Sequence, residues 1–203
     1  MTPEQAAHEL REAVVRIPSG FMTDASTYAR GAELGFEGAD FYVAGRGGVL
    51  GEVDADIVVS AFVFFAPERV HDAWRRSGLV MPHAQAAREW AAIAHAWANA
   101  NLADDVDWRT VAALAGRVVQ AAPVAAAPLF AGWRALEEPE EVKALALHRL
   151  NALRELRGAL HGAAVLTVGL SPIEAVVVLT PTMLPVFGWP EPYPDPKPLH
   201  DRW

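Results

Sequence analysis

Three polar side chains interrupt the most apolar part of the chain: Arg154, Arg157 and His161, spaced by three and four residues. On a helix this spacing places all three on one face, in line with Leu147 and Leu150. Because that helix is apolar on most of its sides, we expect it to be central and this face to be turned toward protein. Arginine stabilises negative charge and histidine takes or gives a proton, so the face predicts an interior pocket with polar chemistry.

The cost of burying an arginine leaves two interpretations open. A buried guanidinium without a partner costs several kcal/mol, so an acid or an anion must meet it. In the first interpretation a ligand is that anion, and Gly158 and Gly162 permit its close approach at a cost of about 1 kcal/mol each relative to alanine. In the second, Glu155, Asp40 or Glu33 forms structural ion pairs, and the histidine is a hydrogen-bonded core residue.

A further arginine lies in the glycine-rich segment GADFYVAGRGGVLGEV, residues 38–53. The segment lacks both common phosphate-binding patterns, because no Lys-Ser/Thr follows its glycines and the G-x-G-x-x-G spacing fails. We therefore expect the glycines to let two helices cross closely, and Arg46 to point into the same interior as the first cluster. Asp40 and Tyr42 are the nearby polar candidates. Apolar walls are expected from the aromatic residues of this region, Phe41, Tyr42, Phe62, Phe64 and Phe65.

Catalysis is an alternative use of the same pocket, with His161 as general acid or base in a lyase, isomerase or transferase step. Glu155 is a poor partner for it, because residues six apart on a helix face different ways. The chain has no G-x-S-x-G and no histidine pair with metal-ligand spacing, so neither a hydrolase elbow nor a protein metal site is expected. A haem needs a single axial histidine, so a haem bound through His161 stays an option.

Composition restricts the partners and the compartment. The 203 residues carry 25 acidic and 17 basic side chains, a formal net charge of −8, and no cysteine. An acidic chain repels a phosphate backbone unless its basic residues share a face, and Arg75 and Arg76 are the only adjacent basic pair. We therefore expect no nucleic-acid partner, and a transcriptional regulator is kept only as an alternative.

The same composition predicts a cytoplasmic protein. The absence of cysteine fits a reducing compartment, and the N-terminal residues have no signal-peptide pattern. Residues 162–190 form an apolar run, but prolines break it below the roughly 20 residues that a spanning helix needs. No membrane partner is expected.

Apolar periodicity and capping patterns predict a mainly α protein, a single multi-helix domain with short connections. The strongest pattern predicts a long central helix at about 139–168. Thr2 and Ser171 each begin a capping-box pattern, and Pro18 is expected to end the first helix. The form of residues 35–67 stays open, because a fully buried strand and a buried helix have the same apolar pattern.

The chain changes character at residue 181, with seven prolines in the last 23 residues. Such a segment is neither a helix interior nor a central strand. We expect a helical domain at 1–180 and an extended arm at 181–203. Phe187, Trp189 and Tyr193 are expected to dock the arm on the body or on a second copy, so a homo-oligomer formed through the arm is an option.

Three stretches carry a resemblance to a known family: IPSGFMTDASTYARGAELGFEGADFYVAGRGGVLGEVDADIV, APLFAGWRALEEPEEVKALALHRLNALRELRGALHGAAVL and FGWPEP. Over nearly the whole chain the sequence resembles a group of uncharacterised actinobacterial proteins, some of which have a general helix-turn-helix label. The resemblance implies a mainly helical cytoplasmic protein and no particular activity. Members of the group continue past the proline-rich arm into an acidic helix, so the resemblance leaves open whether this chain is short at that end.

The residues and the resemblance favour a protein that binds a small anionic or aromatic metabolite in an interior pocket. The side chains expected to orient the metabolite are Arg46, Arg154, Arg157 and His161, with Tyr42 and Asp40 beside them. An enzyme of secondary metabolism that uses His161 remains the alternative.

Overall fold

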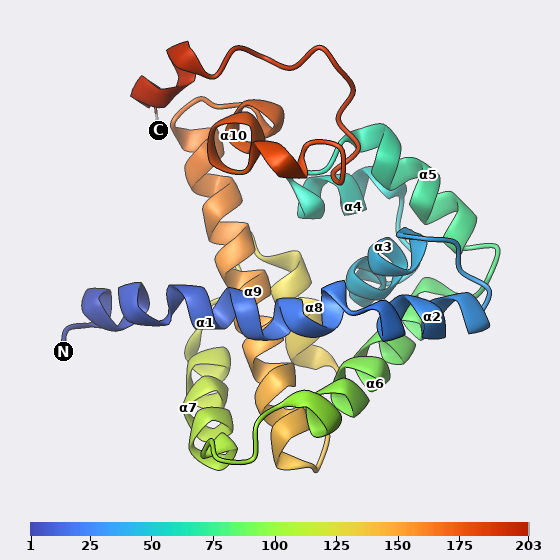
Figure 1. The fold of residues 1–203 in the computed structure, drawn as a ribbon, viewed down its shortest axis with the longest axis vertical. Coiled ribbons are helices and arrows are strands. Elements are labelled where there is room, and N and C mark those ends of the chain that lie inside the picture. The colour runs from blue at the N-terminus through green and yellow to red at the C-terminus, as the bar shows by residue number, and fades with distance from the viewer. Residues whose placement is uncertain (203) are drawn as a thin grey trace.

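The computed structural model describes residues 1–202 and places ten α-helices and no strand in them (Figure 1). The predicted mainly α fold is confirmed. The helices are α1 (Pro3–Thr23), α2 (Ala25–Glu33), α3 (Asp40–Gly47), α4 (Ala55–Phe62), α5 (Pro67–Ser77), α6 (His83–Asn101), α7 (Trp108–Ala121), α8 (Pro128–Ala135), α9 (Val142–Thr167) and α10 (Pro172–Leu179). Three short 3-10 helices are η1 (Gly48–Leu50), η2 (Pro181–Met183) and η3 (Lys197–Arg202).

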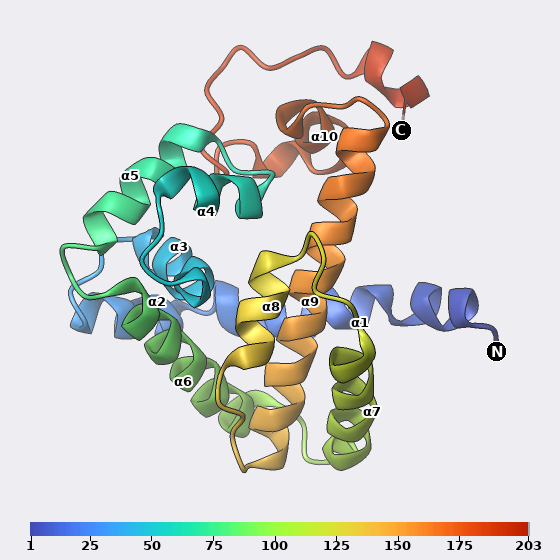
Figure 2. The same ribbon diagram turned by 180° about the vertical axis from the view of Figure 1, so that it is seen from behind.

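Helix α9 is the central element, and it contacts α1, α6, α7, α8 and α10. It runs along the long axis of the molecule with α1 crossing one side of it (Figure 1) and α7 and α8 flanking the other (Figure 2). The prediction placed this helix at 139–168, and it begins later, with Glu141 as its N-cap. The acidic residues before it therefore belong to the connection from α8.

Glycines in α3 and at the start of η1 allow this segment to lie against α6 without a gap. A Cβ on Gly45 would stand 2.6 Å from the Cβ of Trp90 on α6. A Cβ on Gly48 would overlap the backbone carbonyl of His83 at the start of the same helix. Since real Cβ atoms do not approach so closely, these positions accept only glycine, as the expectation of closely crossing helices required.

The first helix does not end at Pro18, so that expectation is wrong: α1 continues through the proline to Thr23. A proline inside a helix removes one hydrogen bond and costs about 3 kcal/mol. Burial in the last turn offsets this cost, because Phe21 is fully buried and Met22 is almost fully buried. Gly20 lies under the ring of Trp97, where a Cβ would be 2.5 Å from the ring edge. Packing here outweighs local preference.

The region whose form was left open, residues 35–67, is helical. It forms α3, η1 and α4, and four residues separate α4 from α5. Phe41 lies in the main core, with its ring centroid 5.0 Å from that of Trp90. Phe62, at the end of α4, is also buried and faces the other side of α3.

The chain after α10 returns to the body and packs against it. Leu184, Phe187 and Trp189 join a cluster with the residues of α10. The Trp189 indole N–H donates to the carbonyl oxygen of Phe64 at 2.8 Å. The amide of Ala66 donates to the carbonyl oxygen of Phe187 at 2.9 Å. The division into a domain at 1–180 and an arm at 181–203 stays a prediction.

None of the described helices is by itself long and apolar enough to cross a membrane. Helices α9 and α10 together meet that criterion of length and composition, but they meet at an angle of 106°.

Two histidines that meet between α6 and α9 predict how stability depends on pH. His95 Nε2 lies 3.1 Å from His148 Nδ1, and His148 is almost fully buried. Burial, followed by the nearby charge of His95, lowers the pKa of His148 from 6.5 to about 4, while Glu138 acts in the opposite direction and Arg149 in the same one. His148 therefore binds a proton below about pH 6.5 in the unfolded chain, but only below about pH 4 in the folded chain.

Because the unfolded state binds more protons in this window, we expect stability to fall as pH drops from 6.5 to 4, by up to about 3 kcal/mol. The measurement is urea unfolding at a series of pH values, for the wild type and for His148→Leu. The variant should lose most of the pH dependence, whereas His8→Leu, at an exposed position, should keep it. An equal slope in the wild type and His148→Leu would contradict the assignment.

Candidate functional site

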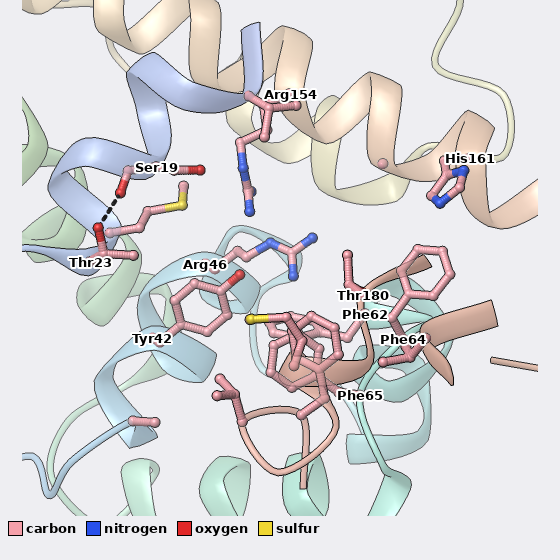
Figure 3. Close-up of a pocket in the computed structure, with 18 of the residues that line it drawn as sticks. Ser19, Thr23, Tyr42, Arg46, Phe62, Phe64, Phe65, Arg154, His161 and Thr180 are labelled. Carbon is pink, nitrogen blue, oxygen red and sulfur yellow. Dashed lines mark hydrogen bonds between the residues drawn. The ribbon is translucent and has the colours of Figure 1, made fainter. Parts of the chain in front are cut away.

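A cavity of about 470 Å³ opens beside α9, bounded by α1, α3, the turn after α4, and α10 with the segment that follows it (Figure 3). Arg46, Tyr42, Arg154, Arg157 and His161 all line it. Its volume lies within the range of small-molecule sites, about 300–1,000 Å³. The structure thus brings five of the six expected polar residues to one cavity.

The innermost charged group is a buried ion pair between α3 and α9. Arg46 donates from Nε to Glu155 Oε1 at 2.9 Å and from Nη2 to Oε2 at 2.8 Å. The Glu155 side chain is 1 % exposed and that of Arg46 is 9 % exposed. Arg46 therefore points into the interior as expected, and its partner is the acid weighed for a structural ion pair.

Opposing effects set the protonation of this pair. Burial is the largest single effect and on its own lowers the pKa of Arg46, but the charge and hydrogen bonds of Glu155, with a contribution from Tyr42, together outweigh it, so the pKa of Arg46 is raised. Burial is the largest single effect and on its own raises the pKa of Glu155, but the charges and hydrogen bonds of Arg46 and Arg154 together outweigh it, so the pKa of Glu155 is lowered. Both groups therefore stay ionised at neutral pH.

The arginines of α9 differ in their surroundings. Arg154 donates from Nη1 to Glu155 Oε1 at 2.8 Å, and its side chain is 20 % exposed. Figure 3 shows it directed toward Arg46 and the hydroxyl end of Tyr42. Arg157 lines the cavity but is exposed, so the expectation of an interior position is wrong for this residue. Beyond Glu155 this face of α9 is more exposed to solvent, and Arg157 lies on it one turn after Arg154.

His161 lies at the far end of the cavity, partly buried, with its ring centroid 5.0 Å from that of Phe64. Burial, and then the positive charge of Arg157, lowers its pKa. The imidazole is therefore neutral at pH 7 and can accept a proton or a hydrogen bond.

Asp40 does not take part in the cavity, contrary to expectation. It accepts from Nε and Nη2 of Arg76 on α5, both at 2.7 Å. Asp40 and Arg46 are six residues apart on α3, so they face different ways, whereas Tyr42 is four residues from Arg46 and shares its face. Among the expected aromatic walls, Phe41 belongs to the core, and Phe62, Phe64 and Phe65 line the cavity with Tyr42.

The turn between α4 and α5 is under backbone strain beside the cavity. Val63 has φ 51° and ψ −61°, and the amide of Phe64 donates to the carbonyl oxygen of Phe62 at 2.6 Å, which closes a γ-turn. A positive φ is rare for a β-branched residue, and such strain persists only when the surrounding packing enforces it. That packing is Gly162 of α9, where a Cβ would stand 3.0 Å from Val63.

Sequence reasoning missed two parts of the lining. Ser19, Met22 and Thr23 come from the last turns of α1, which the expected break at Pro18 had placed outside the first helix. Thr180 and Phe187 come from the chain after α10. A continued apolar spacing from Ile17 to Phe21 was the signal for the first part, and no local pattern marks the second.

The comparison with protein families gives a match over residues 7–192 to a helix-turn-helix family. The chain belongs to this helix-turn-helix family. No curated protein and no solved structure matches it.

Membership of the helix-turn-helix family overturns the expectation that nucleic acid is not a partner, because the family points to a DNA-binding protein. The charge argument failed because a net charge of −8 is a sum over the whole chain, whereas DNA contacts involve one face. Arg75 and Arg76, the adjacent basic pair, are both exposed in the last turn of α5.

The buried ion pair predicts a large effect of Glu155→Gln. Removing the carboxylate leaves the buried Arg46 charge without its partner, so we expect a loss of about 3–5 kcal/mol in the free energy of unfolding. Urea unfolding measures it. Glu33→Gln is the matched control, because Glu33 pairs with Arg30 on an exposed helix face and should cost less than about 0.5 kcal/mol. Equal losses in the two variants would contradict the importance of the buried pair.

Proposed function

We propose that this protein binds a small anionic or aromatic metabolite in the cavity beside α9, and that DNA is its second partner. The first part rests on the cavity and the second on the family match. Together they describe a ligand-responsive DNA-binding protein.

The charge of the cavity wall is the observation that carries the first part. Three arginines line the cavity, and the lining residues include no carboxylate, in a chain whose acids outnumber its bases. Glu155 lies behind the wall and neutralises a single positive charge. The remaining positive charge favours an anion in this space over water alone.

The rest of the wall suits an apolar body. Phe62, Phe64, Phe65 and Phe187 contribute aromatic surface, and α10 contributes aliphatic surface. Ligand sites combine such apolar walls with a few placed polar groups. The ligand therefore has a charged part and an apolar part.

The enzymatic alternative through His161 has less support. The hydroxyl groups of Ser19 and Thr23 lie at the other end of the cavity from His161 (Figure 3). An enzyme that used His161 would need a reacting group beside it, whereas binding needs only the charged and apolar wall described above, so we favour binding.

Gly158 offers a test that separates blocked binding from unfolding. It lines the cavity, and a Cβ built on it meets no atom within 4 Å. Gly158→Leu should therefore raise the melting temperature by about 2–4 °C, because leucine favours the helix by about 1 kcal/mol over glycine. The same side chain should fill the cavity and abolish uptake of 8-anilinonaphthalene-1-sulfonate, an aromatic anion, followed by its fluorescence.

The matched control for this variant is Ala164→Leu, which adds bulk to an exposed position of the same helix and should leave uptake unchanged. In the wild type, a ligand at 100 times its dissociation constant should stabilise the fold by about 2.7 kcal/mol. Equal probe fluorescence in the wild type and Gly158→Leu would mean that the probe binds elsewhere, and the cavity function would then fail.

Helices α4 and α5 are the candidate DNA-binding element. Four residues join these two helices, and α5 carries exposed arginines. We expect fluorescence anisotropy to show binding to a mixture of random-sequence duplexes at low salt, and to show weakening as salt rises, since bound cations are released from DNA. Arg75→Glu should weaken this binding more than Arg30→Glu, the same change on α2. No binding at 50 mM salt, or an equal effect of both variants, would contradict this role.

A further inference from the structure

We propose that the cavity selects an aromatic monoanion, with its charged end on Arg154 and Tyr42 and its ring among the phenylalanines of the turn after α4. This inference rests on the proposed function, because it names the ligand class of the same cavity. Three features carry it: the charge balance, the use of each guanidinium, and the aromatic wall.

The charge balance favours a single negative charge. Arg46 and Glu155 form a bidentate pair and cancel, and Arg154 shares the same carboxylate. This buried group therefore carries one positive charge in excess, which a monoanion neutralises. A dianion would leave uncompensated negative charge in a medium of low dielectric constant, and the exposed Arg157 is too screened by solvent to balance it fully.

The two inner guanidiniums are used differently. Arg46 directs Nε and Nη2 at Glu155, and its Cζ lies 4.3 Å from the ring centroid of Phe62. It is therefore held from both sides and supports the wall. Arg154 donates only its Nη1 to Glu155, so it keeps further N–H donors, and Figure 3 shows its end directed into the cavity toward Arg46 and Tyr42. Arg154 is accordingly the group that recognises the anion.

The aromatic wall favours a ring over an aliphatic body of the same size. The rings of Tyr42 and Phe65 are stacked with centroids 5.8 Å apart, and Phe65 meets Phe187 at 4.4 Å. Tyr42 also meets Phe62 edge to face at 6.1 Å. All four of these residues line the cavity, and an aromatic ligand gains attraction to such rings beyond that of the buried area.

Four compounds on related skeletons test charge and aromaticity separately: naphthalene-2-carboxylate, naphthalene-2-carboxamide, 2-naphthyl phosphate and decalin-2-carboxylate. Dissociation constants are measured at pH 7.5 by displacement of 8-anilinonaphthalene-1-sulfonate from the full chain. We expect naphthalene-2-carboxylate to bind at least tenfold more tightly than each of the other three. Arg154→Gln should reduce the preference for carboxylate over carboxamide to below threefold without changing the affinity for the carboxamide. Arg117→Gln, the same change at an exposed position of α7 outside the lining, should change carboxylate affinity by less than threefold.

The outcomes separate the two proposals. Carboxamide or phosphate binding as tight as that of the carboxylate would overturn the monoanion, and equal binding of the decalin compound would overturn the aromatic ring; the cavity function would survive both. A preference that persists in Arg154→Gln would overturn the role of Arg154, provided that the variant melts within a few degrees of the wild type. Absence of binding by all four compounds and by the fluorescent probe would remove the proposed function as well.

Discussion

The buried pair of Arg46 and Glu155 is the constraint on which the cavity depends. It joins α3 to α9 across 109 residues of sequence with two parallel hydrogen bonds. Neither charge tolerates burial without the other, because desolvation of each ion costs several kcal/mol. The pair therefore fixes the rotation of α3 about its axis relative to α9. That rotation turns Tyr42 toward the cavity and Asp40 away from it, since these two residues lie on different faces of α3.

The same pair accounts for the excess of positive charge that remains. Glu155 accepts three hydrogen bonds in all, two from Arg46 and one from Arg154. Its acceptor capacity is thus largely used within the protein. Two guanidiniums that meet one carboxylate cannot both be neutralised by it, so the ion pair accounts for the charge of Arg46 and the proposed ligand concerns the charge of Arg154. Arg46 is structural, and Arg154 is left with charge that faces the cavity.

Sequence alone supports much of this arrangement, and its failures have physical causes. The position of α9, the interior direction of Arg46 and the place of His161 follow from helical spacing and from the cost of burying charge. Asp40 and Arg157 were placed wrongly, because the outcome depends on where neighbouring helices end and no local pattern states that. The break expected at Pro18 was wrong for a related reason: burial of Phe21 against α6 is a tertiary effect that local propensity does not contain.

The two glycines of α9 show why residue type alone does not assign a role. Gly158 and Gly162 are one turn apart, and the sequence analysis predicts the same role for both. A Cβ on Gly158 meets open space, whereas one on Gly162 meets Val63 in the strained turn between α4 and α5. One glycine leaves room in the cavity and the other lets the turn approach. Because Phe62, Phe64 and Phe65 of that turn also form the cavity wall, the same short stretch of backbone meets the cavity on one side and begins α5 on the other. Any molecule that fills the cavity would therefore contact the segment that leads into α5, the helix with the exposed arginine pair.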